Sequence, residues 1–279
     1  MERERLTITL RQDVLEQLDR KIDGYRLRNR SHAIEYFLSR ELGGKLTRAV
    51  VLCGGRGVQL RPFTYELPKP MVPVKGRPLL EHVIEGLRDQ GIRDIILTID
   101  YLGDKIAAHF GDGGKFGVKI QYAKASKPIG TAGSLRLTKE LVGDQPFLLV
   151  YGDVLAKVDY QELIDFHAEH KKLVTMALTS VADPSAAGAV SLRGAKVVAF
   201  TEKPKPGPTT SRLISAGIFV VDPEVIGKIP TGSSMASLEK DIFPGLIKDG
   251  QIDGFVFDAP WYDVSTPDSY ERVLKEWHD

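Results

Sequence analysis

A glycine-rich loop is the first feature of this 279-residue sequence that could do chemistry. The loop covers residues 54–62 and directly follows an apolar run at residues 49–53. Glycines let backbone amides approach phosphate oxygens closely, and they accept positive φ angles. The loop contains neither the Gly-Lys-Ser/Thr of a Walker loop nor the GxGxxG dinucleotide pattern. Its residues alone therefore leave two interpretations open, a structural turn or a phosphate cradle.

A single lysine in a proline-rich frame follows this loop. Lys69 lies within the run LPKPMVPV at residues 67–74. Because prolines fix φ, the direction of the Lys69 side chain is restricted. A directed ammonium near a phosphate cradle suits a triphosphate or a sugar phosphate. The alternative is an ordinary surface lysine between turns.

Residues 50–74 resemble the signature of the sugar-phosphate nucleotidyltransferases, in which a strand is followed by GGxGTRLxPxT and then PKPMxPV. Further segments resemble the same family in the same order. These segments are Gly130–Gly133, Tyr151–Asp153, Thr201–Pro204, Ser215–Phe219, Glu239–Pro244 and Trp261–Pro267. The resemblance implies an enzyme that joins a nucleoside triphosphate to a sugar 1-phosphate and releases pyrophosphate.

The resemblance also implies roles for individual residues. In this reaction a sugar-phosphate oxygen attacks the α-phosphorus, so two polyanions must be brought together by positive charge and Mg²⁺. The matched metal ligands are Asp153 and Asp263. The matched catalytic residues are Lys69, Gln59, Arg61, Asp153 and Lys203. The matched nucleotide-binding residues are Leu52, Gly54, Gly55, Arg56, Gly57, Gly130, Thr131 and Gly133, and the sugar-phosphate residues are Glu202, Lys203 and Gly217.

Two positions depart from the family pattern. Gln59 stands where the family carries an arginine that contacts the phosphates, and a glutamine donates hydrogen bonds without charge. Arg56 and Arg61 flank it, and either one is a candidate substitute. An alternative hypothesis is that the protein is a sensor of a nucleotide or a sugar nucleotide with weak or no catalytic activity. Such a sensor would bind DNA through an N-terminal module formed by residues 1–45. Ser265 stands where the family usually has glycine.

The sequence leaves open which base the nucleoside triphosphate carries and which sugar the sugar 1-phosphate contains. The run at residues 128–133 is somewhat closer to mannose-1-phosphate guanylyltransferases than to thymidylyltransferases. Glucose-1-phosphate uridylyl- and thymidylyltransferases remain the other candidates.

The order of predicted elements favours an α/β fold. Residues 46–151 alternate between apolar strands and amphipathic helices, which indicates an open sheet wrapped by helices. Strands are expected at 49–53, 95–99, 118–122, 147–151, 172–180, 188–193, 196–201, 215–221 and 253–258, and helices at 78–87, 101–110, 131–141, 236–248 and from 267. With the resemblance, this predicts a Rossmann-like open mixed sheet as a nucleotidyltransferase domain over residues 46–279.

The first 45 residues form a separate predicted module. Residues 4–11 alternate like a strand, Asp13 is expected to cap one helix that ends at Gly24, and Ser31 is expected to cap another. This segment resembles the ribbon-helix-helix DNA-binding family, in which two chains pair their strands. The resemblance implies a homodimer, or a homotetramer if the catalytic domains also pair. The implied DNA-contacting residues are Arg5, Thr7, Thr9 and Arg11.

Composition narrows the class of protein. Residues 1–48 hold 11 basic and 8 acidic side chains, against 27 and 29 in the remainder, so the bias permits a nucleic-acid partner without requiring one. No apolar run approaches the roughly 20 residues that span a bilayer, and the charged N-terminus lacks a signal-peptide pattern. The single cysteine, Cys53, excludes an intramolecular disulfide. These features predict a cytoplasmic protein without membrane contact.

Overall fold

The computed structural model describes residues 7–24, 27–42, 46–205, 211–231 and 235–278. The chain divides into two compact units, residues 1–45 and residues 46–279.

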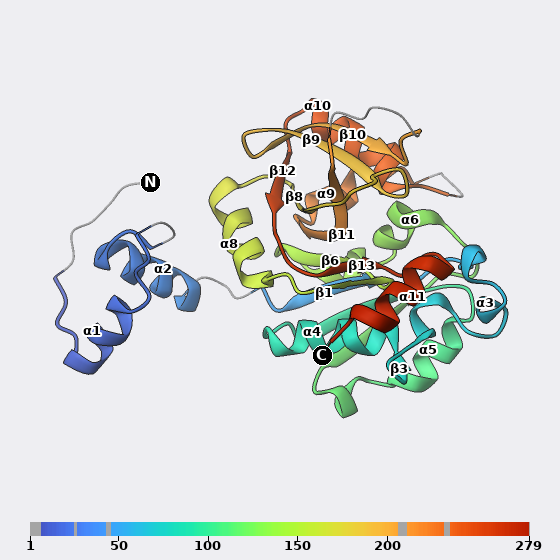
Figure 1. Cartoon of the computed structure of the whole chain (residues 1–279), viewed down its shortest axis with the longest axis horizontal. Helices are drawn as coiled ribbons and strands as arrows, with labels where there is room; N and C mark the ends of the chain where they lie inside the picture. The colour runs from blue at the N-terminus through green and yellow to red at the C-terminus, as the bar shows by residue number, and fades with distance from the viewer. Residues whose placement is uncertain (1–6, 25–26, 43–45, 206–210, 232–234, 279) are drawn as a thin grey trace. The chain divides into compact units, whose positions relative to one another are not determined.

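The second unit is built around a nine-stranded mixed sheet (Figure 1). The strands from one edge to the other are β5 (Lys119–Lys124), β4 (Asp94–Ile99), β1 (Arg48–Leu52), β6 (Phe147–Tyr151), β11 (Leu213–Val221), β8 (Val174–Ser180), β12 (Ile252–Val256), β10 (Lys196–Glu202) and β9 (Gly188–Arg193). Strands β5, β4, β1 and β6 run parallel, whereas β11 is antiparallel to both of its main neighbours, β6 and β8. The predicted α/β fold with an open mixed sheet is therefore confirmed.

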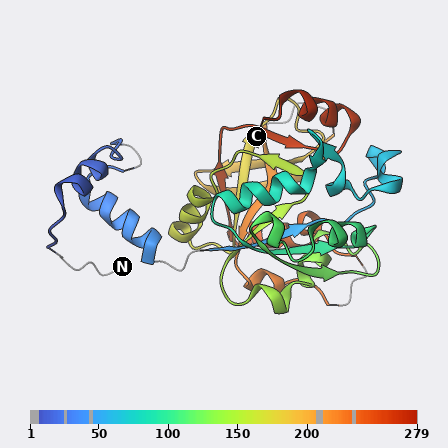
Figure 2. The ribbon, with the colours of Figure 1, turned by 90° about the horizontal axis from the view of Figure 1, so that it is seen from below.

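Helices cover both faces of this sheet (Figures 1 and 2). In β1, Ala49 and Val51 pack in one apolar core and Val50 in the other, because successive side chains of a strand point to opposite faces. The first core includes side chains of α4 (Leu79–Asp89), α5 (Gly103–Phe110), α8 (Tyr160–His170) and α11 (Pro267–Glu276). The second includes side chains of α6 (Gly130–Arg136), α7 (Lys139–Val142), α9 (Glu224–Gly227) and α10 (Phe243–Lys248). The continuous apolar runs of the parallel strands follow from this burial on both faces.

The parallel strands bring three loops together at their carboxyl ends. The glycine-rich loop follows β1, Asp100 follows β4, and Asp153 follows β6. The loop contains the short helix η1 (Val58–Leu60), and α3 (Phe63–Glu66) and η2 (Lys69–Met71) come after it. Carboxyl ends of strands are where ligands bind in open α/β sheets, so the fold gathers the predicted phosphate-binding segments there.

A two-stranded ribbon brings the C-terminal region to the carboxyl ends of the same strands. Strand β7 (Val154–Ala156) pairs antiparallel with β13 (Trp261–Asp263), and Asp263 is the register partner of Val154. The backbone amide of Val264 also donates to the carbonyl of Asp153 at 2.9 Å. Two aspartates more than a hundred positions apart in the sequence therefore become neighbours. This ribbon was not predicted from the sequence.

Several predicted helices need correction. The expected helix at 131–141 is interrupted between α6 and α7, where the Thr138 hydroxyl donates to the carbonyl of Leu135 at 2.8 Å. Such side-chain bonds compete with the helical pattern. The helix expected near 236–248 begins with a π-helical turn, η4 (Leu238–Ile242), before α10. Helix α8 was not predicted. Smaller elements complete the unit: β2 (Pro73–Val74), β3 (Arg77–Pro78) and η3 (Gly114–Phe116).

The first unit contains two helices, α1 (Gln12–Asp19) and α2 (Arg30–Leu42). The guanidinium of Arg30 binds the carboxylate of Asp19 through contacts of 2.7 and 2.6 Å. Two expectations are wrong in detail. Helix α1 ends at Asp19 instead of continuing to Gly24, and Asp13 lies inside it instead of capping it. Asn29 caps α2 in place of Ser31, because its side chain accepts from the amide of His32 at 2.9 Å.

The segment before α1 leaves its apolar side chains exposed. Thr7–Arg11 carry no regular secondary structure in this single chain, while residues 1–6, including the predicted strand start and Arg5, lie outside the described residues. Ile8 is 45% exposed and Leu10 is 38% exposed, and Val14, which lies within α1, is 38% exposed as well. Thr7, Thr9 and Arg11 are exposed as well. The predicted ribbon-helix-helix pairing stays a prediction. In both units, none of the described helices has the length and apolar character needed to cross a bilayer.

Candidate active site

A cavity of about 500 Å³ opens beside the carboxyl ends of the parallel strands, where the glycine-rich loop, β7 and β13 meet. Six residues predicted from the sequence line it, namely Gln59, Asp153, Glu202, Lys203, Gly217 and Asp263. These residues come from segments spread over two hundred positions of the chain, so the fold itself assembles the site.

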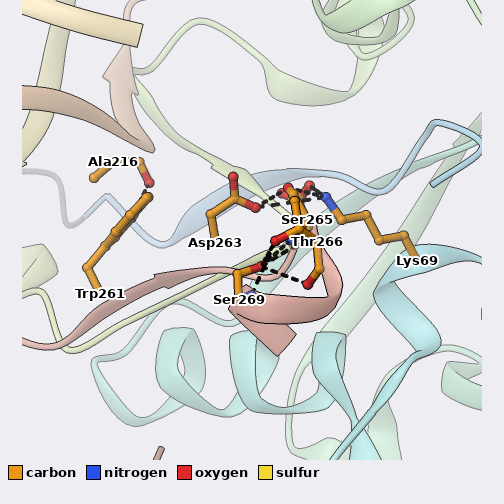
Figure 3. A network of polar contacts seen from close by, with 8 residues as sticks. Lys69, Ala216, Trp261, Asp263, Ser265, Thr266 and Ser269 are labelled. Carbon is orange, nitrogen blue, oxygen red and sulfur yellow. Dashed lines mark hydrogen bonds and ion pairs between the residues drawn. The ribbon is translucent and has the colours of Figure 1, made fainter. Parts of the chain in front are cut away.

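Lys69 lies between the two aspartates. Its ammonium donates to Asp153 Oδ2 in a short contact and to the hydroxyl of Ser265 at 2.7 Å, and it lies 3.9 Å from Asp263 Oδ1. Figure 3 shows Lys69 and Asp263 approaching Ser265 from opposite sides. The Lys69 side chain is only 14% exposed. The lysine of the proline frame therefore points between two carboxylates and a serine hydroxyl, and these partners were not predicted from the sequence.

The acidic pair, Asp153 and Asp263, has the electrostatics of a cation site. Burial raises the pKa of Asp263, the negative charge of Asp153 raises it further, and Lys69 and the Ser265 hydroxyl act in the opposite direction. Two carboxylates whose repulsion is only partly offset can accept further positive charge. Mg²⁺ is commonly bound by one or two carboxylates together with substrate phosphates and water, so this pair fits such an ion.

Glu202, Lys203 and Gly217 also line the cavity. Lys203 has φ of 46° although it is not glycine, and its amide donates to the carbonyl of Ala187 at 3.0 Å. Left-handed backbone at such a residue costs energy and often marks a functional position. Burial raises the pKa of Glu202, with a further contribution from the charge of Glu239.

Gly217 brings the backbone of β11 close to the cavity. It has φ of 70°, and a Cβ there would lie 3.2 Å from Val154 Cγ2 and 3.3 Å from the Tyr151 ring. A larger residue would be strained in its backbone and would crowd both side chains. Gly217, which the resemblance implies is a sugar-phosphate residue, is among the residues that line the cavity.

The glycine-rich loop is held by a residue that the sequence analysis missed. The carboxylate of Asp100 accepts from the amide of Gly55 at 2.8 Å, and a Cβ on Gly54 would lie 2.7 Å from Asp100 Oδ2. Gly57 has φ of 56°, and a Cβ there would lie 2.8 Å from Thr64 Cγ2. Asp100 could have been found from its position at the carboxyl end of a strand beside β1.

Gln59 is the one residue of segment 54–61, which is described throughout, that lines the cavity. The guanidinium of Arg61 lies over the ring of Tyr65, 4.8 Å from its centroid, and Arg56 is exposed. Neither flanking arginine therefore occupies the place of Gln59 on the cavity wall.

The predicted turn at Gly130–Gly133 lies beside the cavity and not on its wall. Gly130 has φ of 77°, and a Cβ there would meet the carbonyl oxygen of Ala236 at 2.2 Å. The Thr131 hydroxyl donates to Glu239 Oε2 at 2.9 Å, and the Tyr151 hydroxyl donates to the other oxygen of Glu239. Leu52, Gly54, Gly55, Arg56 and Gly57 are likewise beside the cavity and not among its lining residues.

Glu239, Tyr151 and Arg272 line the cavity without having been predicted as site residues. Glu239 and Tyr151 stand inside motifs that the resemblance already identified, so their position was the available signal. Arg272 lies on α11, where its guanidinium is 5.2 Å from the ring centroid of Tyr262 and binds Glu276 at 2.9 Å. No sequence pattern singled it out.

Known proteins resemble this chain over most of its second unit. The mannose-1-phosphate guanylyltransferase of Mycobacterium tuberculosis is 38% identical over 227 residues, which is 80% of this chain and 62% of that protein. The chain thus spans less than two thirds of the length of this relative. A putative glucose-1-phosphate thymidylyltransferase of Bacillus anthracis, crystallised with sucrose, has a TM-score of 0.75 and 26% identity, covering 83% of this chain and 96% of that chain.

A further solved structure is HddC of Yersinia pseudotuberculosis complexed with GMP-PN, with a TM-score of 0.71 and 25% identity, covering 82% of this chain and 99% of that chain. Residues 48–279 match the family model described as nucleotidyl transferase. Proteins of this family generally use a divalent metal ion. The chain therefore belongs to the nucleotidyltransferase family, as the order of its motifs predicted.

Proposed function

We propose that residues 46–279 transfer a nucleotidyl group from a nucleoside triphosphate to a sugar 1-phosphate, with GTP and mannose 1-phosphate as the substrates. The observation that carries this proposal is the meeting of Lys69, Asp153 and Asp263 at a cavity that Glu202 and Lys203 also line. A site that must join two polyanions needs positive charge, and Lys69 and Lys203 supply part of it.

The residues of the site have separate roles in the proposed reaction. Lys203 binds the phosphate of the sugar, and Glu202 accepts hydrogen bonds from the sugar hydroxyls. Lys69 turns its ammonium toward the triphosphate. A phosphate oxygen of the sugar phosphate then attacks the α-phosphorus, the bond from that phosphorus to the bridging oxygen of the leaving group breaks, and pyrophosphate departs. Asp153 and Asp263 would hold Mg²⁺, which offsets the negative charge of the phosphates.

The charge of the cavity supports a need for this ion. Five carboxylates line the cavity and only two basic side chains do. The acidic residues are Asp153, Asp183, Glu202, Glu239 and Asp263, and the basic residues are Lys203 and Arg272. Two phosphorylated substrates would meet net negative charge there, so a divalent cation is required to offset the repulsion.

The choice of substrates rests on the named relatives. Mycobacterial and fungal relatives of 38% and 34% identity are mannose-1-phosphate guanylyltransferases, and one solved structure of the same fold is a complex with GMP-PN. The experiment is an assay of pyrophosphate release by the full chain with each of the four nucleoside triphosphates, paired with mannose 1-phosphate or glucose 1-phosphate. We expect the highest kcat/KM with GTP and mannose 1-phosphate. Preference for another pair would overturn the substrate assignment alone.

The rival function is a sensor that binds nucleotide without turning it over. It is favoured by one observation, the uncharged Gln59 on the cavity wall. In that case calorimetry would detect nucleotide binding while every pair of substrates failed to release pyrophosphate.

For residues 1–45 we propose pairing with a second copy of the chain. The support is the uncovered apolar side chains of Ile8, Leu10 and Val14, since a lone segment with alternating apolar residues leaves both its backbone and its apolar face without partners. Ile8→Glu in the full chain should lower the solution mass to that of a smaller assembly. The matched control is Thr9→Glu, which adds the same charge at the neighbouring position.

An unchanged mass in both variants would remove the pairing role. Contact with DNA through Arg5, Thr7, Thr9 and Arg11 is a separate proposal. It predicts binding of random duplex DNA that weakens as salt is added, and an absence of binding at low salt would leave the segment with assembly only.

A further inference from the structure

Ser265 connects Lys69 to Asp263. The Lys69 ammonium donates to Ser265 Oγ at 2.7 Å, and the Ser265 hydroxyl donates to Asp263 Oδ1 in a short contact. The direct separation of Lys69 Nζ and Asp263 Oδ1 is 3.9 Å, which is too long for a hydrogen bond. The hydroxyl therefore fills the space between a cation and a carboxylate that do not bond each other directly (Figure 3).

The chemistry of the three groups fixes the direction of both bonds. An ammonium has donors and no acceptor, so Lys69 must donate to the serine oxygen. The one hydroxyl proton of Ser265 is then available for Asp263. Both polar contacts of Asp263 just described involve Oδ1, and Figure 3 shows its other carboxylate oxygen pointing away from Ser265 and Lys69.

The backbone around Ser265 is anchored on both sides. The amide of Ser265 donates to Ser269 Oγ at 3.1 Å, and Thr266 and Ser269 form a capping box at the start of α11. On the other side, the amide of Val264 donates to the carbonyl of Asp153 at 2.9 Å. The Ser265 side chain is therefore presented to Lys69 and Asp263 from a fixed position, and this precision does not depend on a bound substrate.

We propose that Ser265 is a positioning residue that orients Asp263 through Oδ1 and leaves its other oxygen available to the divalent cation. This inference rests on the proposed function. Because Ser265 keeps hold of Asp263, Lys69 can turn toward the substrate phosphates without releasing that carboxylate. The family motif that this segment resembles usually has glycine here, which offers no side chain to make this connection.

The experiment compares Ser265→Ala with the full-length wild-type protein. Calorimetry measures the affinity for a GTP analogue whose α–β phosphate bridge cannot be cleaved, at a series of Mg²⁺ concentrations. Residues that orient metal ligands typically contribute about 10- to 100-fold to metal affinity. Mg²⁺ should increase the affinity for the analogue, and we call the Mg²⁺ concentration that gives half of this increase the Mg²⁺ midpoint. We expect the Mg²⁺ midpoint to rise about 10-fold or more in Ser265→Ala. In turnover assays, kcat at saturating Mg²⁺ should fall much less than the apparent Mg²⁺ affinity.

Two further variants separate positioning from folding. Ser265→Thr retains the hydroxyl and should restore the Mg²⁺ dependence. Val273→Ala leaves a cavity behind a buried side chain of α11 and should lower the unfolding temperature while leaving the Mg²⁺ dependence close to wild type. An unchanged Mg²⁺ midpoint in Ser265→Ala would overturn the inference, and so would an equal shift in Val273→Ala. A wild-type protein that binds the analogue with Mg²⁺ but releases no pyrophosphate would overturn the proposed function without affecting this test.

Discussion

The acidic pair and the glycine-rich loop both lie at the carboxyl ends of strands, but they are held in different ways. Asp153 and Asp263 are tied together through Lys69 and Ser265, by contacts between distant parts of the chain. The loop is held by its own backbone and by Asp100, and it presents the uncharged Gln59 to the cavity. Charge in the site is therefore concentrated on the acidic pair and the lysines, and the loop contributes shape more than charge.

The largest expected effect tests the acidic pair. Asp153→Asn removes one of the two carboxylates proposed for the cation and the partner of Lys69. Metal ions stabilise such transition states by several kcal/mol, so kcat/KM should fall about 10³-fold or more. The assay is pyrophosphate release, with circular dichroism to confirm the fold. The matched control is Asp183→Asn, another carboxylate on the cavity wall, which should stay within a few fold of wild type. Full activity in Asp153→Asn would disprove the metal assignment.

The next effect tests the loop. Gln59→Arg places a charged donor on the cavity wall, and a charge-assisted hydrogen bond is roughly twice as strong as a neutral one. If the loop lacks a charge that the reaction can use, kcat should rise about 10-fold or more. Gln59→Met, of similar length without donors, should not raise it. A loss of activity in Gln59→Arg would show that Lys69 and Lys203 already supply the needed charge.

The smallest effect concerns stability without substrates. The pKa of Asp263 is raised above its ordinary value of 3.8, mainly by burial and then by the charge of Asp153. The fold therefore disfavours the charged carboxylate, and this cost is absent below pH 3.8 and grows as the pH rises to the raised pKa. Asp263→Asn removes the cost.

Substitutions that relieve a strained functional site commonly stabilise proteins by about 0.5–2 kcal/mol. Asp263→Asn should accordingly be more stable to urea at pH 7 by about 1 kcal/mol, and the difference should shrink as the pH falls toward 4. A variant less stable than wild type at pH 7 would mean that Asp263 is held by net attraction.

The difference between the two regions also explains what the sequence could predict. The loop and the order of strands were predicted because glycine spacing and apolar periodicity are local signals. The site residues Asp153 and Asp263 were identified only through the resemblance, since each is an ordinary turn aspartate when considered alone. Their meeting depends on the β7–β13 ribbon, whose three-residue strands are too short to show a period.

Other parts were missed for related reasons. Asp100 and Ser265 act through contacts with segments far away in the sequence. Asp100 is marked by its place at the end of a strand and Ser265 by its departure from the family pattern, but neither signal identifies the partner of the side chain. The start of α2 was misplaced by two residues because Asn29 and Ser31 are both good capping residues, and only the bond from His32 to Asn29 distinguishes them. Thr138 lies where a predicted helix is interrupted, and its hydroxyl donates to the carbonyl of Leu135.

The most direct measurement follows the α-phosphorus itself. The full chain is incubated with Mg²⁺, mannose 1-phosphate and GTP labelled with ³²P at the α-position, and the products are separated by chromatography. The account predicts that the label appears in a GDP-sugar together with an equal amount of unlabelled pyrophosphate, and that neither product forms when the divalent cation is removed. Label that stays in GTP, or that appears in GMP without a sugar, would contradict nucleotidyl transfer by this site.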